Sequence, residues 1–269
     1  MAGWCSLARA EWRFEAETGA VYDSNLSNSD RSADVRDDWA WRSAVSANNG
    51  LQLTHDLRLN LGADVRGELW DQFSAFNNIG EGLSSGLRYR FGLGRQAPWV
   101  SLPVRLGYDR FQDTSQSGYD NVVNLRGGVG LSDRLALEGG YSFESFVAPD
   151  SFYDRQVYRA DLRVAFDVTS SLQVACGYTY REGDVISYAF PPRPDIARFA
   201  IEREDENDFG LPLRTAYKFP ARTHTLSLSV AYQLTRHASV QFSYEYALTT
   251  RDPVQYEKHL LEAKIAFAY

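Results

Sequence analysis

Hydrophobic and polar residues alternate with a period of two along this chain, from near its start to its last residue. In one segment the apolar members are Leu226, Leu228, Val230, Tyr232 and Leu234, separated by threonine, serine, alanine and glutamine. The alternation resumes at once, with valine, phenylalanine, tyrosine and leucine at every second position from 240 to 248. A period of two places each set on its own face of a β-strand.

The aromatic residues gather toward the strand ends, on the same face as the aliphatic residues of the middle. A soluble β-sandwich has no reason to sort its aromatics in this way, whereas a lipid-facing barrel needs an aliphatic band between aromatic girdles. The predicted fold is therefore all-β, a transmembrane antiparallel up-and-down β-barrel. The aromatics expected at the membrane interfaces are Trp12, Trp39, Trp41, Tyr89, Tyr108, Tyr141, Tyr178, Tyr180, Tyr232, Tyr244, Tyr246 and Tyr269.

The pattern predicts about twelve strands, an even number that returns both termini to the periplasmic side. Four short turns share one motif, an apolar residue, a hydroxyl, two polar residues and an apolar residue, as in Leu131-Ser132-Asp133-Arg134-Leu135. The hydroxyl can bond the backbone two residues on and close a tight hairpin. The predicted strands span residues 11–23, 38–53, 57–70, 83–93, 99–111, 120–131, 135–146, 156–168, 172–182, 223–234, 238–248 and 258–269.

The segment 182–222 is the longest of the predicted extracellular loops. Residues 209–219 also alternate, and pairing them with 198–203 would give fourteen strands, although Pro212 interrupts such a ladder. We favour a long loop that contains a hairpin. This loop is a candidate for folding inward, with an apolar cap of Tyr188, Phe190, Pro191 and Pro192 and an acidic rim at 202–208; a solvated surface loop is the alternative.

Composition agrees with one barrel that takes up residues 11–269. The mean hydropathy is −0.39 and no apolar window is long enough for a transmembrane helix. A net charge of −7 argues against a nucleic-acid partner. Residues 1–10 end in Ala8-Arg9-Ala10 and are interpreted as the remnant of a signal peptide, with a lipid anchor at Cys5 as the alternative. No disulfide is expected between Cys5 and Cys176.

Two short segments carry family resemblances. The terminal Ile265-Ala266-Phe267-Ala268-Tyr269 resembles the last strand of bacterial outer-membrane β-barrels, in which the final residue is usually Phe. Tyr22-Asp23-Ser24-Asn25 is similar to a motif of barrels associated with exopolysaccharide and envelope export systems. The resemblance implies the outer membrane of a Gram-negative bacterium, contact with lipopolysaccharide, delivery by the barrel-insertion machinery and, for the second motif, subunits of an export complex as partners.

The face opposite the aliphatic one is rich in charge of both signs, and its cations are mostly arginine. Arg–carboxylate pairs that brace the interior are one interpretation, and a wet, selective pore is the other. Six of these arginines fall on four consecutive strands, which predicts a basic wall. The predicted pore-lining residues are Arg58, Asp64, Arg66, Glu68, Arg88, Arg90, Arg105, Asp109, Arg126, Glu138, Glu144, Arg159, Asp161 and Arg163.

The sequence does not favour an enzyme. His55 and His237 fall in predicted periplasmic turns, and His224 and His259 fall near the extracellular rim on the lipid side. Thr225 points away from His224, so no base and nucleophile meet within that strand. We expect no catalytic residues, no metal site and no cofactor. The predicted function is a porin-like channel for small polar or anionic solutes; a closed structural or docking barrel is the alternative, and an outer-leaflet lipid-modifying enzyme is less favoured.

Overall fold

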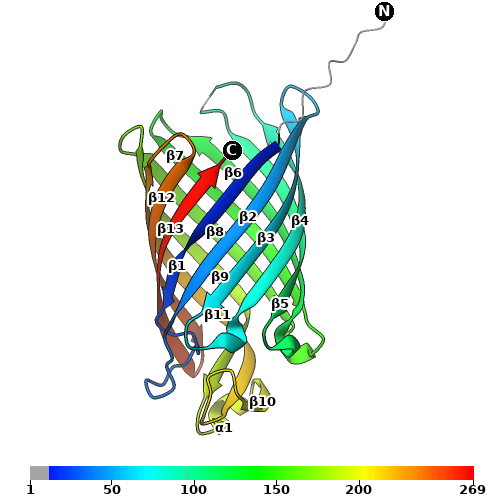
Figure 1. Cartoon of the computed structure of the whole chain (residues 1–269), viewed down its shortest axis with the longest axis vertical. Helices are drawn as coiled ribbons and strands as arrows, with labels where there is room; N and C mark the ends of the chain where they lie inside the picture. The colour runs from blue at the N-terminus through cyan, green and yellow to red at the C-terminus, as the bar shows by residue number, and fades with distance from the viewer. Residues whose placement is uncertain (1–11, 95) are drawn as a thin grey trace, which may run out of the picture.

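The computed structural model describes residues 12–94 and 96–269, and these form a closed β-barrel (Figure 1). Thirteen strands belong to one antiparallel sheet, in which β10 pairs with β11 alone. The remaining twelve close on themselves, because β9 pairs with β11 and β13 pairs with β1. The twelve-strand barrel predicted from the alternation is thereby confirmed, with one further strand outside it.

The barrel strands are β1 Trp12–Asp23, β2 Asp38–Gln52, β3 Leu57–Trp70, β4 Asn78–Arg90, β5 Trp99–Phe111, β6 Gly118–Gly130, β7 Leu135–Val147, β8 Arg155–Asp167, β9 Leu172–Ala189, β11 Arg214–Gln233, β12 Ala238–Arg251 and β13 Val254–Ala268. The extra strand β10 spans Ile201–Glu206, and the helix α1 spans Pro194–Ala197. Three short 3₁₀ turns are η1 Ser74–Phe76, η2 Thr114–Gln116 and η3 Ser151–Tyr153. Among the described residues, no helix is long and apolar enough to cross a membrane.

Short turns and long loops lie at opposite ends of the barrel. The described ends of the chain lie with the short turns, and α1 and β10 lie at the other end (Figure 1). We call these the turn end and the loop end. At the turn end the predicted hydroxyl motif is confirmed: Ser132 Oγ accepts hydrogen bonds from the amides of Arg134 and Leu135, at 3.2 and 3.0 Å. Thr169 and Thr235 bond the amides two residues on at 3.2 Å each.

The two faces of the strands differ in exposure and in polarity. Leu83, Leu106 and Leu226 point outward, with 68%, 58% and 59% of their surface exposed. An apolar outer wall of this kind suits lipid rather than water, and the closure of the twelve strands leaves no open sheet edge in the wall. Cys176 lies exposed without a disulfide partner in the described chain. The signal-peptide prediction for residues 1–10, including Cys5, lies outside the described residues.

Residues 182–222 were predicted as one loop, but both ends of this segment belong to strands, so the loop is shorter than predicted. β9 continues to Ala189 and β11 begins at Arg214, so the two remain paired beyond the barrel rim. β10 then pairs with the start of β11, with Ile201 opposite Lys218. The predicted loop with a hairpin is confirmed. The pairing imagined in the fourteen-strand alternative also occurs, but as an extension of β11 and not as further barrel strands.

Several other bounds differ from the prediction. β4 begins at Asn78, five residues before the predicted start at 83, and β6 begins at Gly118. β12 and β13 meet across a turn at 252–253, where a loop of ten residues was expected. A strand that extends beyond the lipid needs no apolar face. Its end therefore carries polar residues, and the sequence pattern predicted a loop there.

Candidate functional site: the barrel interior and its lid

The predicted pore-lining residues lie on one face of six consecutive strands, β3 to β8. Along each strand they alternate with the outward apolar residues, as Arg66 does with the exposed Val65 and Arg105 with the exposed Leu106. All fourteen therefore share the inward face. Whether that face lines a conducting path depends on which charges are paired and on what space is left between them.

A network of ion pairs covers the inner wall from β3 to β6. Arg105 binds Asp64 through two parallel bonds of 2.7 and 3.0 Å and reaches Asp120 at 2.5 Å. Arg66 binds Asp109 at 2.8 Å and Asp120 at 3.0 Å. These contacts hold strands β3, β5 and β6 in one arrangement, and they join two guanidiniums to three carboxylates.

Glycine on β4 makes the network sterically feasible. Both arginines reach across β4, where Gly80 and Gly82 face inward. A Cβ atom at Gly82 would overlap the guanidinium of Arg105, and one at Gly80 would overlap Asp109. The side chains thus lie over a strip of bare backbone, which is why β4 carries no inward charge at this height.

Three further pairs continue around the barrel. Arg159 binds Glu144 at 3.1 Å and Arg126 lies 3.6 Å from Asp161. On the other side of the network, Arg42 of β2 binds Glu68 at 2.7 Å. Three of the six arginines of the predicted basic wall, Arg66, Arg105 and Arg126, are therefore paired with carboxylates, most of them two or three strands away.

Three arginines near the turn end are different. Arg58 lies directly opposite Arg88 across the β3–β4 ladder, and Arg90 follows two residues later on the same face. The guanidinium of Arg88 lies 4.1 Å from the ring centre of Trp99. Within residues 12–94 and 96–269, none of the three forms an ion pair with a carboxylate. We call Arg58, Arg88 and Arg90 the turn-end arginines.

The facing wall is made of small, uncharged side chains. On β11 the inward positions from Thr223 to Gln233 carry threonine, serine, alanine and glutamine but no charge. Ser229 lies between Ala175 of β9 and Ser243 of β12. The free space of the interior lies between the long charged side chains on one side and the short hydroxyls on the other.

That space forms three cavities in a row. The first, of 680 Å³, lies at the turn end and is lined by Glu15, Gln173 and Gln233 among others. The second, of 360 Å³, lies beside Arg66 and Asp109 and shares Glu17 with the first. The third, of 320 Å³, lies toward the loop end and shares Phe111 with the second. The interior thus contains three separate cavities, and neighbouring cavities share lining side chains.

Aromatic residues from several loops meet over the third cavity. Phe209 packs against Phe73 and Tyr188, each with a ring-centre distance of 4.9 Å, and Phe76 lies 5.1 Å from Phe209. Phe152 belongs to the same cluster. These rings come from the loops after β3, after β7 and after β10, and from the extended end of β9. We call this aromatic cluster, with the loops that carry it, the lid.

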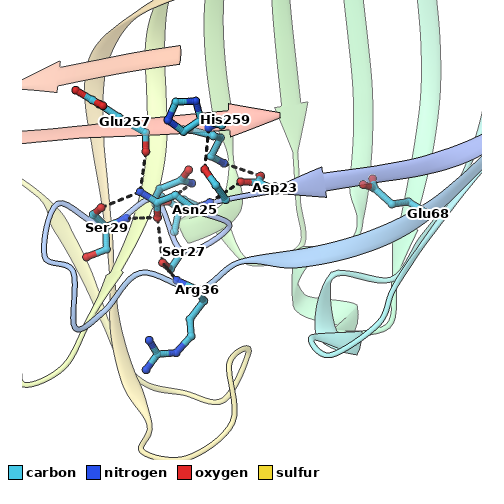
Figure 2. A network of polar contacts seen from close by, with 12 residues as sticks. Asp23, Asn25, Ser27, Ser29, Arg36, Glu68, Glu257 and His259 are labelled. Atoms are coloured by element: carbon cyan, nitrogen blue, oxygen red, sulfur yellow. Dashed lines mark hydrogen bonds and ion pairs between the residues drawn. The ribbon is translucent and has the colours of Figure 1, made fainter. Parts of the chain in front are cut away.

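The first loop is tied across the mouth by the motif that begins at Tyr22. Figure 2 shows Asn25 at the centre of this loop, where its Nδ2 donates to the backbone oxygens of Ser29 (2.9 Å) and of Glu257 on β13 (3.1 Å). Ser24 Oγ accepts from the amide of His259 at 2.8 Å. Beyond this anchor, the carbonyl of Ser27 accepts from the amide of Tyr188 at 3.0 Å. The motif thus has a structural role in this chain, since it directs the first loop over the barrel to β9.

The composition of the lid corrects the predicted cap and rim. Phe190 is 46% exposed, and Pro191 and Pro192 are exposed as well, so of the predicted cap only Tyr188 is buried in the cluster. The reason is that β9 continues to Ala189, which leaves the three next residues outside. The rim prediction for residues 202–208 is wrong for Glu206 and Asp208, which are both buried.

Three carboxylates meet inside the lid, and two of them are buried. Glu206, Asp208 and Asp113 place oxygen atoms within 4.8 Å of one another, the spacing at which acidic groups can hold a metal ion. The hydroxyl of Tyr188 donates to Asp208 at 2.8 Å, and that of Tyr153 donates to Glu206 at 3.2 Å. Burial raises the pKa of Glu206 and of Asp208 above their ordinary values.

The predicted interface aromatics lie on the outward face. Trp12, Trp39 and Tyr232 are 58%, 52% and 49% exposed near strand ends, and Tyr269 follows the last strand. Tyr141 differs in position, because it lies in the middle of β7.

The outward histidines are partners of tyrosines in this layer. His224 Nδ1 lies 2.7 Å from the hydroxyl of Tyr178, and His259 Nδ1 lies 2.8 Å from that of Tyr244. A position at the membrane surface suits such amphipathic pairs.

Sequence reasoning missed three charged residues of the interior. Asp120 accepts from both arginines of the network, yet position 120 was taken as the boundary of a loop. Arg155 and Lys258 line the third cavity and were placed at loop ends for the same reason. The signal that could have found them is parity, because each continues the inward alternation of its strand.

A closed twelve-strand barrel with an apolar outer wall and a charged interior defines the class: the chain has the fold of bacterial outer-membrane β-barrels. No family model and no curated protein matches its sequence. Among solved structures it is similar to an outer membrane channel from Pseudomonas putida F1, with a TM-score of 0.67, 10% identity and coverage of 100% of both chains. It is also similar to the NanC porin, with a TM-score of 0.51 and 12% identity over 94% of this chain and 98% of that one.

Proposed function

We propose that this protein is a channel in the outer membrane of a Gram-negative bacterium, which passes small polar and anionic solutes. The observation that carries the proposal is the row of three cavities that leads from the turn end to the lid. A barrel of purely structural purpose has no need of such space, because its interior is most stable when filled. The similarity in fold to an outer membrane channel and a porin supports the same conclusion.

The charge of the interior supports a preference for anions. In the ion-pair network three carboxylates share the guanidiniums of Arg66 and Arg105, whereas none of the turn-end arginines forms an ion pair within the described residues. Arg88 and Arg90 are two residues apart on one strand, or about 6.6 Å. An anion that enters at the turn end can pass from one guanidinium to the next without losing its partner.

Reversal potentials in planar bilayers test this preference. Arg88→Glu combined with Arg90→Glu should shift the reversal potential toward cations. The shift should shrink at 1 M salt, where the Debye length is about 3 Å. Arg110→Glu is the matched control, because Arg110 lies near the loop end of β5 on the outward face. A folded, conducting double variant with unchanged selectivity would contradict the role of the turn-end arginines.

A closed structural or docking barrel is the second candidate. It is supported by the lid, which covers the loop end of the barrel. The two candidates differ in what happens when the lid is shortened. Replacing residues 191–211 by a glycine–serine linker removes α1, β10 and Phe209 while keeping the β9–β11 ladder. If the protein is a channel, the shortened variant conducts more ions than the native chain. If a correctly folded variant shows no conductance, the docking barrel is the better assignment.

The proposed location in the outer membrane also determines what each end of the barrel contacts. The turn end faces the periplasm and the loop end faces outward, where the loops contact lipopolysaccharide. The last strand, ending in Phe267 and Tyr269, is the segment by which the barrel-insertion machinery would receive the chain. Partners from an export complex would dock on the exposed part of the lid.

A further inference from the structure

The third cavity, beneath the lid, holds three cations, of which only one is paired with a carboxylate of the described chain. Its walls carry the side chains of Arg155, Arg181 and Lys258. Lys258 is paired with Asp23 at 2.9 Å. Arg155 lies with its guanidinium 4.8 Å from the ring centre of Phe146, and Arg181 donates to the backbone oxygen of Asp184 at 3.0 Å. Within the described chain, neither arginine forms an ion pair.

The nearby carboxylates are already engaged. Those that attract Arg155 over a longer range are Asp109, Asp120 and Glu144. Asp109 and Asp120 bind Arg66, Asp120 also binds Arg105, and Glu144 binds Arg159. Asp184 also lines the cavity, and its carboxylate accepts from the amide of Gln156 at 3.0 Å. With Asp23 and Asp184 counted against three cations, the cavity retains a positive charge.

An enclosed guanidinium without a counter-ion is costly, since its hydration is lost and no protein charge replaces it. Here two such groups come from adjacent strands, β8 and β9, and face the same space. Their planar forks suit oxygen pairs of carboxylate or phosphate groups. Tyr256 and Gln116 line the same cavity and add hydrogen-bonding groups.

We propose that this cavity is a binding site for one small anion, a carboxylate or phosphate group on a body of monosaccharide size or less. Arg155 and Arg181 bind the anionic group, and the lid closes over the rest of the molecule. The volume of 320 Å³ limits the size. Phe111 lines both this cavity and the middle one, which places the site next to the cavities that begin at the turn end.

The proposal deepens the channel proposal, yet it is tested by binding and not by conduction. Isothermal titration of the detergent-solubilised barrel with inorganic phosphate, glucuronate, glucose 6-phosphate and neutral glucose is the experiment. Saturable binding of phosphate-bearing or carboxylate-bearing probes, with none of glucose, is the expected result, and the better-bound probe identifies the source of the anionic group. No saturable binding of any anion overturns the site.

Arg155→Gln with Arg181→Gln should weaken binding at least tenfold. The matched control is Arg110→Gln, which removes a cation from the outward face and should leave affinity unchanged. Since removal of uncompensated charge relieves a cost, the double variant should fold, as the shift in gel mobility on heating will verify. Wild-type affinity in the folded double variant overturns the proposal.

Single-channel recordings separate this site from the channel role. Binding without any conductance in the native or lid-shortened chain leaves the site in place and contradicts the channel. Conductance without binding contradicts the site alone.

Discussion

Single residues in this barrel are governed by the face on which they lie. Leu228 and Ser229 are neighbours on β11, yet Leu228 is 50% exposed on the outer wall while Ser229 faces the interior between Ala175 and Ser243. The backbone environment is the same for both. The difference between lipid and a wet interior therefore decides what each position tolerates.

Leu228→Arg and Ser229→Arg measure that difference directly. An arginine near the middle of the lipid face should lower the free energy of unfolding by about 2–4 kcal/mol. An arginine at Ser229 enters a polar space bordered by small side chains and should cost less than about 1 kcal/mol. Urea unfolding in lipid vesicles gives both values. Equal losses would mean that the assignment of the two faces is wrong.

At the scale of elements, the lid combines loops that are far apart in the sequence. Its buried carboxylates Glu206 and Asp208 face Asp113, the guanidinium of Arg203 and the hydroxyls of Tyr153 and Tyr188. Arg203 also binds Asp150 at 3.1 Å, which connects the cluster to the loop after β7. A change of charge here acts on several loops together.

The raised pKa values predict that acid closes the lid. Burial is the largest cause for both groups, and their ordinary pKa values are 4.5 and 3.8. The docked lid therefore holds protons at a pH where the undocked lid has released them. Its docking is most stable below the ordinary values and weakens as the pH rises through the raised ones. Conductance should accordingly fall when the pH is lowered through that window.

Glu206→Gln together with Asp208→Asn is the test of this dependence. These amides mimic the protonated acids, so the variant should conduct less at neutral pH and lose this part of the pH response. Conductance recorded between pH 7 and pH 4 gives the comparison. An unchanged pH response in the variant would show that the lid carboxylates do not control it.

The whole molecule has a sidedness that follows from its hairpins. The hydroxyl turns and the described chain ends share one end, and α1, β10 and the lid share the other (Figure 1). Since the loops of such barrels face outward, an epitope tag after Pro192 should be labelled on intact cells. A tag after Ser170 should be labelled only after permeabilisation. Both positions are exposed, so burial does not confound the comparison. Labelling at Ser170 on intact cells would invert the topology.

What the sequence by itself determined is the barrel wall. Alternation with a period of two is a local property, and lipid on one side with water on the other imposes it on every strand; the hydroxyl turns at Ser132 and Thr169 are equally local. Strand number and the inward position of Arg66 or Arg105 therefore follow from the chain alone.

Only the tertiary structure decided which charges are paired and where the interior is closed. Asp120 meets Arg105 across the β5–β6 ladder, so the ion-pair network depends on strand register. Phe73 and Phe209 lie 136 positions apart and meet because the closed barrel brings their loops over one mouth. Contacts of this kind arise from closure, and no local pattern of residues encodes them.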